Sequence, residues 1–186
     1  MLDGVCITGG EPLMRTDLER CGRAIYDRGF PWGMVTNGLA LTRKRFDALL
    51  ASGMHSATVS LDGLEEDHNN MRGNNNSFSA ASNAIAMMAS ESDFVFDVVT
   101  CVTQRNIDKL DAIKEHLLSL GCTNWRLFTV FPAGRAASDP ELQLSREQST
   151  GLCPIYSEAN YHLQLALRAI YYPPATLPLS TTLHIR

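Results

Sequence analysis

The fold is indicated first by the stretch Val5–Leu13, which reads VCITGGEPL. An apolar run typical of a buried strand ends in a Gly9-Gly10 turn, which is followed by a carboxylate, Glu11, and then by a proline. No Cβ intervenes at a glycine, so the backbone of such a turn can approach a ligand closely. The stretch therefore predicts a small-molecule site at the end of a strand. Because it lies so near residue 1, we also expect that an element which ordinarily precedes this strand is missing.

The composition is that of an ordinary globular protein. The 186 residues are 45% apolar and 19% charged, with a net charge of -4. Runs of lysine and arginine are absent, as are apolar stretches near the roughly 20 residues of a membrane span, so we expect neither a nucleic-acid nor a membrane partner. No two cysteines are spaced as CxxC, and their odd number favours a cytoplasmic location over a disulfide framework. The cysteines are Cys6, Cys21, Cys101, Cys122 and Cys153.

Strand-like and helix-like segments alternate along the chain, which predicts an α/β fold with a parallel sheet, open or rolled into a barrel. The strand-like runs are apolar on both faces, as parallel strands covered by helices should be. Their starts lie roughly 25 to 40 residues apart, the length of a βα repeat. The five predicted strands are Gly4–Thr8, Trp32–Thr36, Ala57–Leu61, Phe94–Val102 and Trp125–Val130.

Helix starts are marked by capping residues. The sequence Thr16-Asp17-Leu18-Glu19 is typical of a capping box. Thr42 is predicted to cap a helix through Ala51, and Asn106 to cap another that ends near Gly121. An apolar stripe from Phe78 to Met88 predicts a helix between the third and fourth strands.

The character of the chain changes near Ala137, so we divide it into a core over residues 1–138 and a divergent extension over 139–186. Ser145–Gln148 can cap one more helix, and Leu163–Tyr172 has helical character. We expect no further βα unit after Gly151 and poor order over the last dozen residues.

Polar residues and glycines follow strand after strand. Ligands in parallel α/β folds bind beyond the carboxyl ends of the strands, so this convergence predicts a site more strongly than any single motif. Plainer readings stay open: Asn37-Gly38 and Asp62-Gly63 as turns, His68 as a surface or capping histidine, and Arg72 as half of a surface ion pair. The residues that follow the first three strands are Gly9, Gly10, Glu11, Thr36, Asn37, Gly38, Ser60, Asp62, His68 and Arg72.

In this order and at these spacings, the motifs resemble those of the radical S-adenosylmethionine (radical SAM) enzymes. The motifs are GGEP at Gly9–Pro12, TNG at Thr36–Gly38, SLDG at Ser60–Gly63, and then His68 and Arg72. Pro132–Ala136, which reads PAGRA, resembles the branch with a C-terminal SPASM or twitch extension, many members of which modify peptides or proteins. The resemblance covers about Gly4 to Ala137.

The resemblance implies a partial (β/α) barrel and a set of SAM-binding residues. Gly9, Gly10 and Glu11 would hold the amino group of the SAM methionine moiety. Ser60 and Arg72 would face its carboxylate or ribose. Supporting roles would fall to Asn37 and Asp62, and the backbone around Val102 and Leu127 would border the adenine. In such an enzyme, SAM and a 4Fe-4S cluster generate a 5′-deoxyadenosyl radical that abstracts hydrogen from the substrate.

The chain departs from the family pattern in its cysteines. Three cysteines spaced as CxxxCxxC hold the 4Fe-4S cluster in this family, and no such triplet occurs in the sequence. Cys6 lies within a strand and is out of register to replace one of them. We therefore expect a fragment that lacks the first βα unit and is inactive alone, with Met1 as a candidate internal start. The alternatives are a non-catalytic remnant or SAM- or peptide-binding module, and a cluster-free barrel enzyme that binds phosphate at its glycine turn.

Overall fold

A single seven-stranded mixed sheet organises the protein. The computed structural model describes residues 4–130, 137, 139–148, 163–164 and 180–184. The strand order is β1-β2-β3-β4-β5-β7-β6, and β1 to β5 run parallel to one another. These five confirm the predicted strands and the α/β class, with the bounds β1 Val5–Ile7, β2 Trp32–Thr36, β3 Met54–Ser60, β4 Val95–Val102 and β5 Asn124–Thr129.

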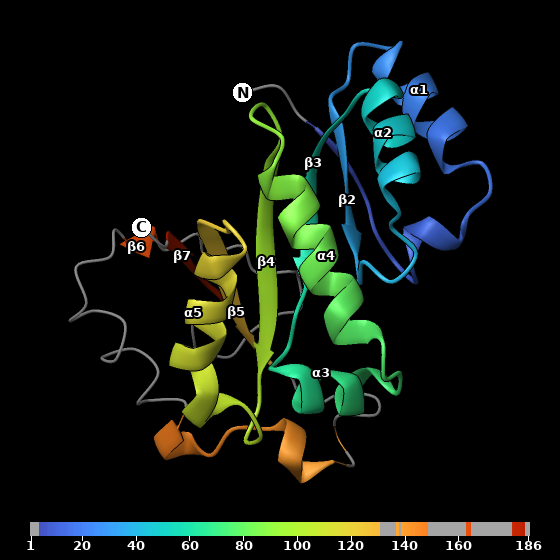
Figure 1. The fold of residues 1–186 in the computed structure, drawn as a ribbon. Coiled ribbons are helices and arrows are strands. Elements are labelled where there is room, and N and C mark those ends of the chain that lie inside the picture. The colour runs from blue at the N-terminus through green and yellow to red at the C-terminus, as the bar shows by residue number, and fades with distance from the viewer. Residues whose placement is uncertain (1–3, 131–136, 138, 149–162, 165–179, 185–186) are drawn as a thin grey trace.

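Helices follow each of the first four parallel strands. Figure 1 shows α1, α2, α4 and α5 along the same side of the sheet, with α3 at its lower end. Three short 3-10 segments, η1, η2 and η4, lie in the connections. The bounds are η1 Pro12–Met14, α1 Leu18–Tyr26, α2 Arg43–Ala51, α3 Glu65–Arg72, α4 Ser77–Ala89, η2 Ile107–Lys109, α5 Leu110–Ser119 and η4 Pro140–Leu142.

The two faces of the parallel sheet differ. Met34, Val59 and Val98 are at most 1% exposed on the face that the helices cover, whereas Thr58 and Asp97 on the other face are only half-buried. Among the described residues the helices therefore lie on one face of the parallel sheet, as in the predicted partial (β/α) barrel. Strands that follow one another in sequence order across a sheet, with right-handed crossovers, place every connecting helix on the same side.

Two of the predicted helix caps differ from the structure. Thr42 does cap α2, since its hydroxyl accepts a hydrogen bond from the Arg45 amide at 3.2 Å. The predicted capping box at Thr16 is wrong, because α1 begins after Asp17 without a side-chain cap. Asn106 does not cap either, because its side chain is bonded to backbone groups around the end of β4.

Near its end the chain returns to the sheet. Strand β7, Ser180–His184, pairs antiparallel with β5, and β6, Leu163–Gln164, pairs with β7. The helix expected from Leu163 is thus wrong at Leu163–Gln164, which form a strand, whereas the poor order expected of the last dozen residues stays a prediction. The edge of β5 that faces away from β4 supplies backbone donors and acceptors for a further strand. No local sequence pattern predicts this long-range pairing. The rest of residues 149–179 lies outside the described part.

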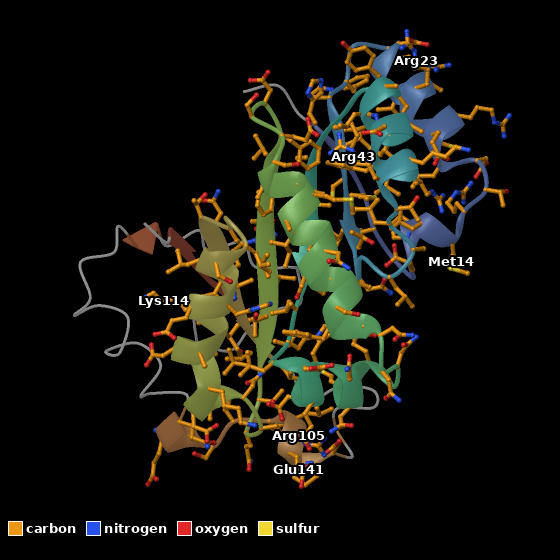
Figure 2. The ribbon with its side chains drawn as sticks, in the orientation of Figure 1. Met14, Arg23, Arg43, Arg105, Lys114 and Glu141 are labelled. Atoms are coloured by element: carbon orange, nitrogen blue, oxygen red, sulfur yellow. The ribbon has the colours of Figure 1, made fainter. Side chains whose placement is uncertain are left out.

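The segment around η4 lies at the carboxyl end of the parallel strands. Arg105, in the loop after β4, binds Glu141 with Nε to Oε2 at 2.7 Å, and the two side chains meet at the lower end of the molecule in Figure 2. The neighbouring Gln104 amide donates to the Glu141 carbonyl at 3.2 Å. Ser145 and Gln148 cap each other reciprocally, as predicted for a helix start. In the described part of the chain, no helix combines the length and apolar character that crossing a bilayer requires.

Candidate functional site

The residues predicted from the strand ends lie along one edge of the sheet. Strands β1, β2, β3 and β4 are neighbours in that order and parallel, and their carboxyl ends all point to the lower end of the molecule in Figure 1. Neighbouring strands lie about 4.8 Å apart. The Gly9–Glu11 loop, Asn37, Ser60 and Asp62 therefore form a continuous row of groups at this edge.

The Gly9-Gly10 turn is open on its outer side. Both residues have positive φ angles, 89° and 55°, which favour glycine over any residue with a Cβ. A Cβ at either position would meet no atom within 4 Å. The turn is thus set by backbone conformation, and both glycines are exposed, with open space where a side chain would lie.

The Glu11 carboxylate joins the ends of β1 and β2. Its Oε1 accepts from the Leu13 amide at 3.0 Å and from the Thr36 hydroxyl at 2.7 Å, and Oε2 accepts from the Asn37 amide at 2.7 Å. A carboxylate offers about four acceptor positions, so one remains on Oε2 for a ligand ammonium. Glu11 therefore also has a structural role, because it connects the ends of two strands, which its sequence context does not indicate.

The turn after β2 is closed by its own side chains. The Thr36 hydroxyl also accepts from the Gly38 amide at 3.0 Å, and the Asn37 side chain accepts from the Leu39 amide at 2.9 Å. Gly38 has a φ of 76°, and a Cβ there would lie 3.1 Å from that of Ala84 in α4. The plainer reading of Asn37 as a turn residue is supported, and its side chain is occupied by that turn.

Ser60 ends β3 on the face that the helices leave open. It is level with Val99 of β4, and Asn37 follows the residue level with Val59, so Asn37 and Ser60 are neighbours across the sheet. The Ser60 side chain is half-buried, and its hydroxyl has no hydrogen bond among the described residues. Within the described part of the chain, it therefore remains available as a donor and acceptor at the predicted edge.

Asp62 is the most heavily bonded group of the site. It is 2% exposed; its Oδ2 accepts from Arg72 Nη2 at 2.5 Å and its Oδ1 from the Cys101 amide at 2.9 Å. The Asn106 side chain donates to the Asp62 carbonyl at 2.6 Å. The structure thus brings the predicted residues Asp62 and Arg72 together, and they form an ion pair with each other. Arg72, at the end of α3, keeps 33% of its side chain exposed, so further N–H groups remain accessible.

His68 is a core residue and not the surface histidine of the plainer reading. It is fully buried, its Nδ1 accepts from the Asp62 backbone amide at 3.0 Å, and its Nε2 has no hydrogen-bond partner among the described residues. Burial lowers its pKa to about 4, Asp62 opposes the shift, and Arg72 adds to it. The ring is therefore neutral near pH 7, and it orients the backbone that presents Asp62.

The two residues assigned to the adenine have buried side chains. Val102 is 0% and Leu127 7% exposed, both towards the helices, so only their backbone could border a ligand on the open face. Cys101, which precedes Val102, lies on that open face beside Asp62, and burial raises the pKa of its thiol to about 11. The PAGRA segment at residues 132–136 lies outside the described residues.

An arginine that the sequence analysis missed anchors the loop after β1. From α2, Arg45 donates through Nη1 to the Leu13 carbonyl, through Nη2 to the Arg15 carbonyl at 2.7 Å, and through Nε to Glu19 at 3.0 Å. These contacts span about 30 residues of sequence, so no local motif could have indicated them. They fix the segment that follows the glycine turn.

The described residues do not fit an iron–sulfur cluster. No group of three or more His, Cys, Asp or Glu side chains within that part of the chain is arranged to hold a metal ion. The exposed Cys6 lies in β1, in register with Gly33 of β2. A 4Fe-4S cluster therefore has no ligand set among these residues, and no step through it follows from them.

Comparison with known proteins places the chain in a family. The model of the radical SAM superfamily matches residues 1–117. The chain belongs to the radical SAM superfamily. It is 32% identical over 137 residues to an AdoMet-dependent heme synthase of Methanosarcina barkeri. The aligned region covers 73% of this chain and 39% of that protein. The PqqA peptide cyclase of Ruegeria pomeroyi is 28% identical over 169 residues, covering 90% and 45%.

Solved structures of this superfamily share the fold. The structure of Streptococcus suis SuiB bound to the precursor peptide SuiA superposes with a TM-score of 0.64 at 11% identity, covering 83% of this chain and 35% of that one. The parallel sheet is thus built like a radical SAM barrel, and this radical SAM chain spans less than half of either curated relative above. The family implies SAM and a 4Fe-4S cluster as cofactors.

Proposed function

We propose that this chain supplies the SAM-binding edge of a radical SAM enzyme, and that the whole protein modifies a peptide or protein. The observation that carries the proposal is the alignment of the open Gly9-Gly10 turn, Glu11 and the free Ser60 hydroxyl along one strand edge. In this family, SAM supplies a 5′-deoxyadenosyl radical that abstracts a hydrogen atom. The residues of this chain bind and orient; none is assigned a proton-transfer step.

Each part of the edge has a proposed role. The Gly9 and Gly10 carbonyls and the remaining acceptor of Glu11 hold the SAM ammonium. Ser60 and the accessible N–H groups of Arg72 face the carboxylate or ribose. Asn37 and Asp62 act in support, since their side chains are engaged by the chain itself. The backbone at Val102 and Leu127 borders the adenine.

A peptide or protein substrate is favoured by two similarities. The match to the PqqA peptide cyclase covers 90% of this chain, and SuiB, which shares the fold, was solved with a precursor peptide.

We propose residues 1–138 as the radical SAM core and 139–186 as an extension, and we propose a cytoplasmic location. The family model ends at residue 117, before the proposed boundary.

A non-catalytic SAM- or peptide-binding module is the second candidate. It is favoured by the lack of a CxxxCxxC triplet in the sequence and of a metal-holding group in the described part. Anaerobic reconstitution with iron and sulfide distinguishes the two: we expect no reductive cleavage of SAM by the 186-residue chain. Cleavage above that of protein-free iron and sulfide would contradict this expectation.

Equilibrium dialysis with labelled SAM tests the proposed binding edge. Ser60→Ala should weaken SAM binding about threefold to tenfold, the usual worth of one hydrogen bond. Ser56→Ala is the matched control, since Ser56 lies on the same strand and face but four residues from the edge. Equal effects of the two substitutions, or no saturable SAM binding by the unaltered chain, would refute the proposal.

A further inference from the structure

A polar cluster of three side chains lies on the open face of the sheet, away from the strand ends. Asp97 of β4 accepts from the Thr58 hydroxyl of β3 at 2.6 Å and from Arg126 Nε of β5. Arg126 Nη2 donates to the same Thr58 oxygen at 3.0 Å. Each pair is thus joined directly, and the cluster crosses three adjacent strands.

The cluster has unused hydrogen-bonding capacity. Of the five N–H groups of a guanidinium, one from Arg126 goes to Asp97 and one to Thr58. The others have no partner in the described part of the chain. The Arg126 side chain is 32% exposed and that of Asp97 20%, so donors and carboxylate lone pairs can both be reached from the open face. Phe128 lies beside the guanidinium, 5.7 Å from ring centre to Cζ.

The cluster adjoins the candidate SAM edge. In the sheet register, Arg126 is level with Val99, which is level with Ser60. Arg126 therefore stands two strands from Ser60, about 10 Å away across the sheet. A molecule that lies on the open face beside a ligand at the strand ends would contact this cluster.

We propose that Asp97 and Arg126 bind the backbone of an extended peptide substrate. One residue of an extended chain directs its own N–H and C=O to the same side, and the cluster offers an acceptor and donors side by side to match them. The two charges balance, so a neutral amide suits the site better than a carboxylate, which Asp97 would repel. The inference rests on the proposed function, since it names the recognition element for the peptide substrate class.

The alternative is that the three side chains only hold β3, β4 and β5 together. They would then not respond to a ligand. Either role explains one feature of the sequence: Asp97 and Arg126 are single charges inside otherwise uncharged strands.

Nuclear magnetic resonance of the isotope-labelled 186-residue chain tests the inference. The Nε–H signal of Arg126 and the Ser60, Val99 and Arg126 amides are followed during titration with N-acetyl-alanyl-alanine N-methylamide. Its anionic counterpart, N-acetyl-alanyl-alanine, is the second probe. We expect saturable shifts with the neutral probe and at least threefold weaker binding of the anionic one.

Three substitutions separate recognition from structure. Arg126→Met should abolish the saturable shifts, Thr58→Val should weaken binding without removing a charge, and Arg23→Met, on the outer side of α1, should leave it unchanged. Variants are compared only where the methyl spectrum retains the native dispersion. Thr58→Val, which keeps both charges and nearly the same volume, serves if Arg126→Met fails to fold.

The inference is overturned by shifts that do not saturate, by equal binding to a folded Arg126→Met chain, or by preference for the anionic probe. Its failure is distinguishable from failure of the proposed function. SAM binding weakened by Ser60→Ala with no peptide response would refute the inference alone. A peptide response with no SAM binding would refute the proposed SAM edge alone.

Discussion

The strand ends are held together in two different ways. Between β1 and β2, the half-buried Glu11 carboxylate accepts only neutral donors, from a hydroxyl and two backbone amides. Between β3 and β4, the carboxylate of Asp62, 2% exposed, is bound by the Arg72 guanidinium and a backbone amide. The first connection lies beside an open glycine turn, and the second is enclosed by Cys101, His68 and Asn106.

The difference separates a half of the edge whose carboxylate a ligand can reach from a half whose carboxylate is enclosed. The three hydrogen bonds to the Glu11 carboxylate leave one acceptor position unused, so a ligand can replace water there with little rearrangement. A buried carboxylate must keep its cation, because an unpaired buried charge is costly. Substitutions should therefore affect SAM binding and stability unequally in the two halves.

The largest loss of stability is expected from Arg72→Met. It leaves the Asp62 carboxylate buried and unpaired, which should lower the free energy of unfolding by about 3 kcal/mol. Urea denaturation measures it. Arg23→Met is the control, because Arg23 and Asp27 are both more than half exposed and their pair contributes little. Addition of Asp62→Asn to Arg72→Met should restore part of the loss; a loss below about 1 kcal/mol would erase the contrast between the halves.

The enclosed half should also be acid-sensitive. The folded pKa of His68, about 4, lies below the ordinary 6.5, so the unfolded chain binds the proton more readily between these values. Stability is then full above pH 6.5 and falls as the pH drops to 4, by at most about 3 kcal/mol.

The histidine contribution is isolated by His68→Asn. Denaturation of both chains from pH 7 to pH 4 should show a smaller slope for the variant, since all other titratable groups are common to the two chains. Parallel stability curves for the two chains would show that His68 is not the group responsible.

Glu11→Gln should cost less stability but more SAM affinity. The amide nitrogen would face the N–H of Asn37, a donor against a donor, so we expect a loss of about 1–2 kcal/mol. Removal of the anionic acceptor for the SAM ammonium should weaken binding at least tenfold. Denaturation and dialysis on the same preparation give both values. A larger stability loss than for Arg72→Met would reverse the assignment of the two halves.

The smallest stability effect is expected from Arg45→Lys. Lysine keeps the charge but cannot reach Leu13, Arg15 and Glu19 together, so the loss should be about 1 kcal/mol. Amide hydrogen exchange should accelerate at Met14 and Arg15 and stay unchanged in α5. Unaltered exchange at these amides would show that Arg45 does not fix the loop.

The sequence predicts the strands and the residues that follow them, which depend on local patterns, but not the contacts between residues far apart in the chain. The strands followed from runs such as Trp32–Thr36, and the site edge from the residues after each run. Arg45 and the Asp97–Arg126 pair depend on partners about 30 residues away, and β7 pairs with β5 across more than 50 residues.

The most direct test of the SAM edge is a nuclear magnetic resonance titration of the labelled chain with SAM. The account predicts saturable shifts at Gly9, Gly10, Glu11 and Ser60, and none at Tyr26, Phe30 and His55, which line an open hollow at the opposite end of the strands. Shifts confined to that hollow, or no saturable shift at any of these residues, would contradict it.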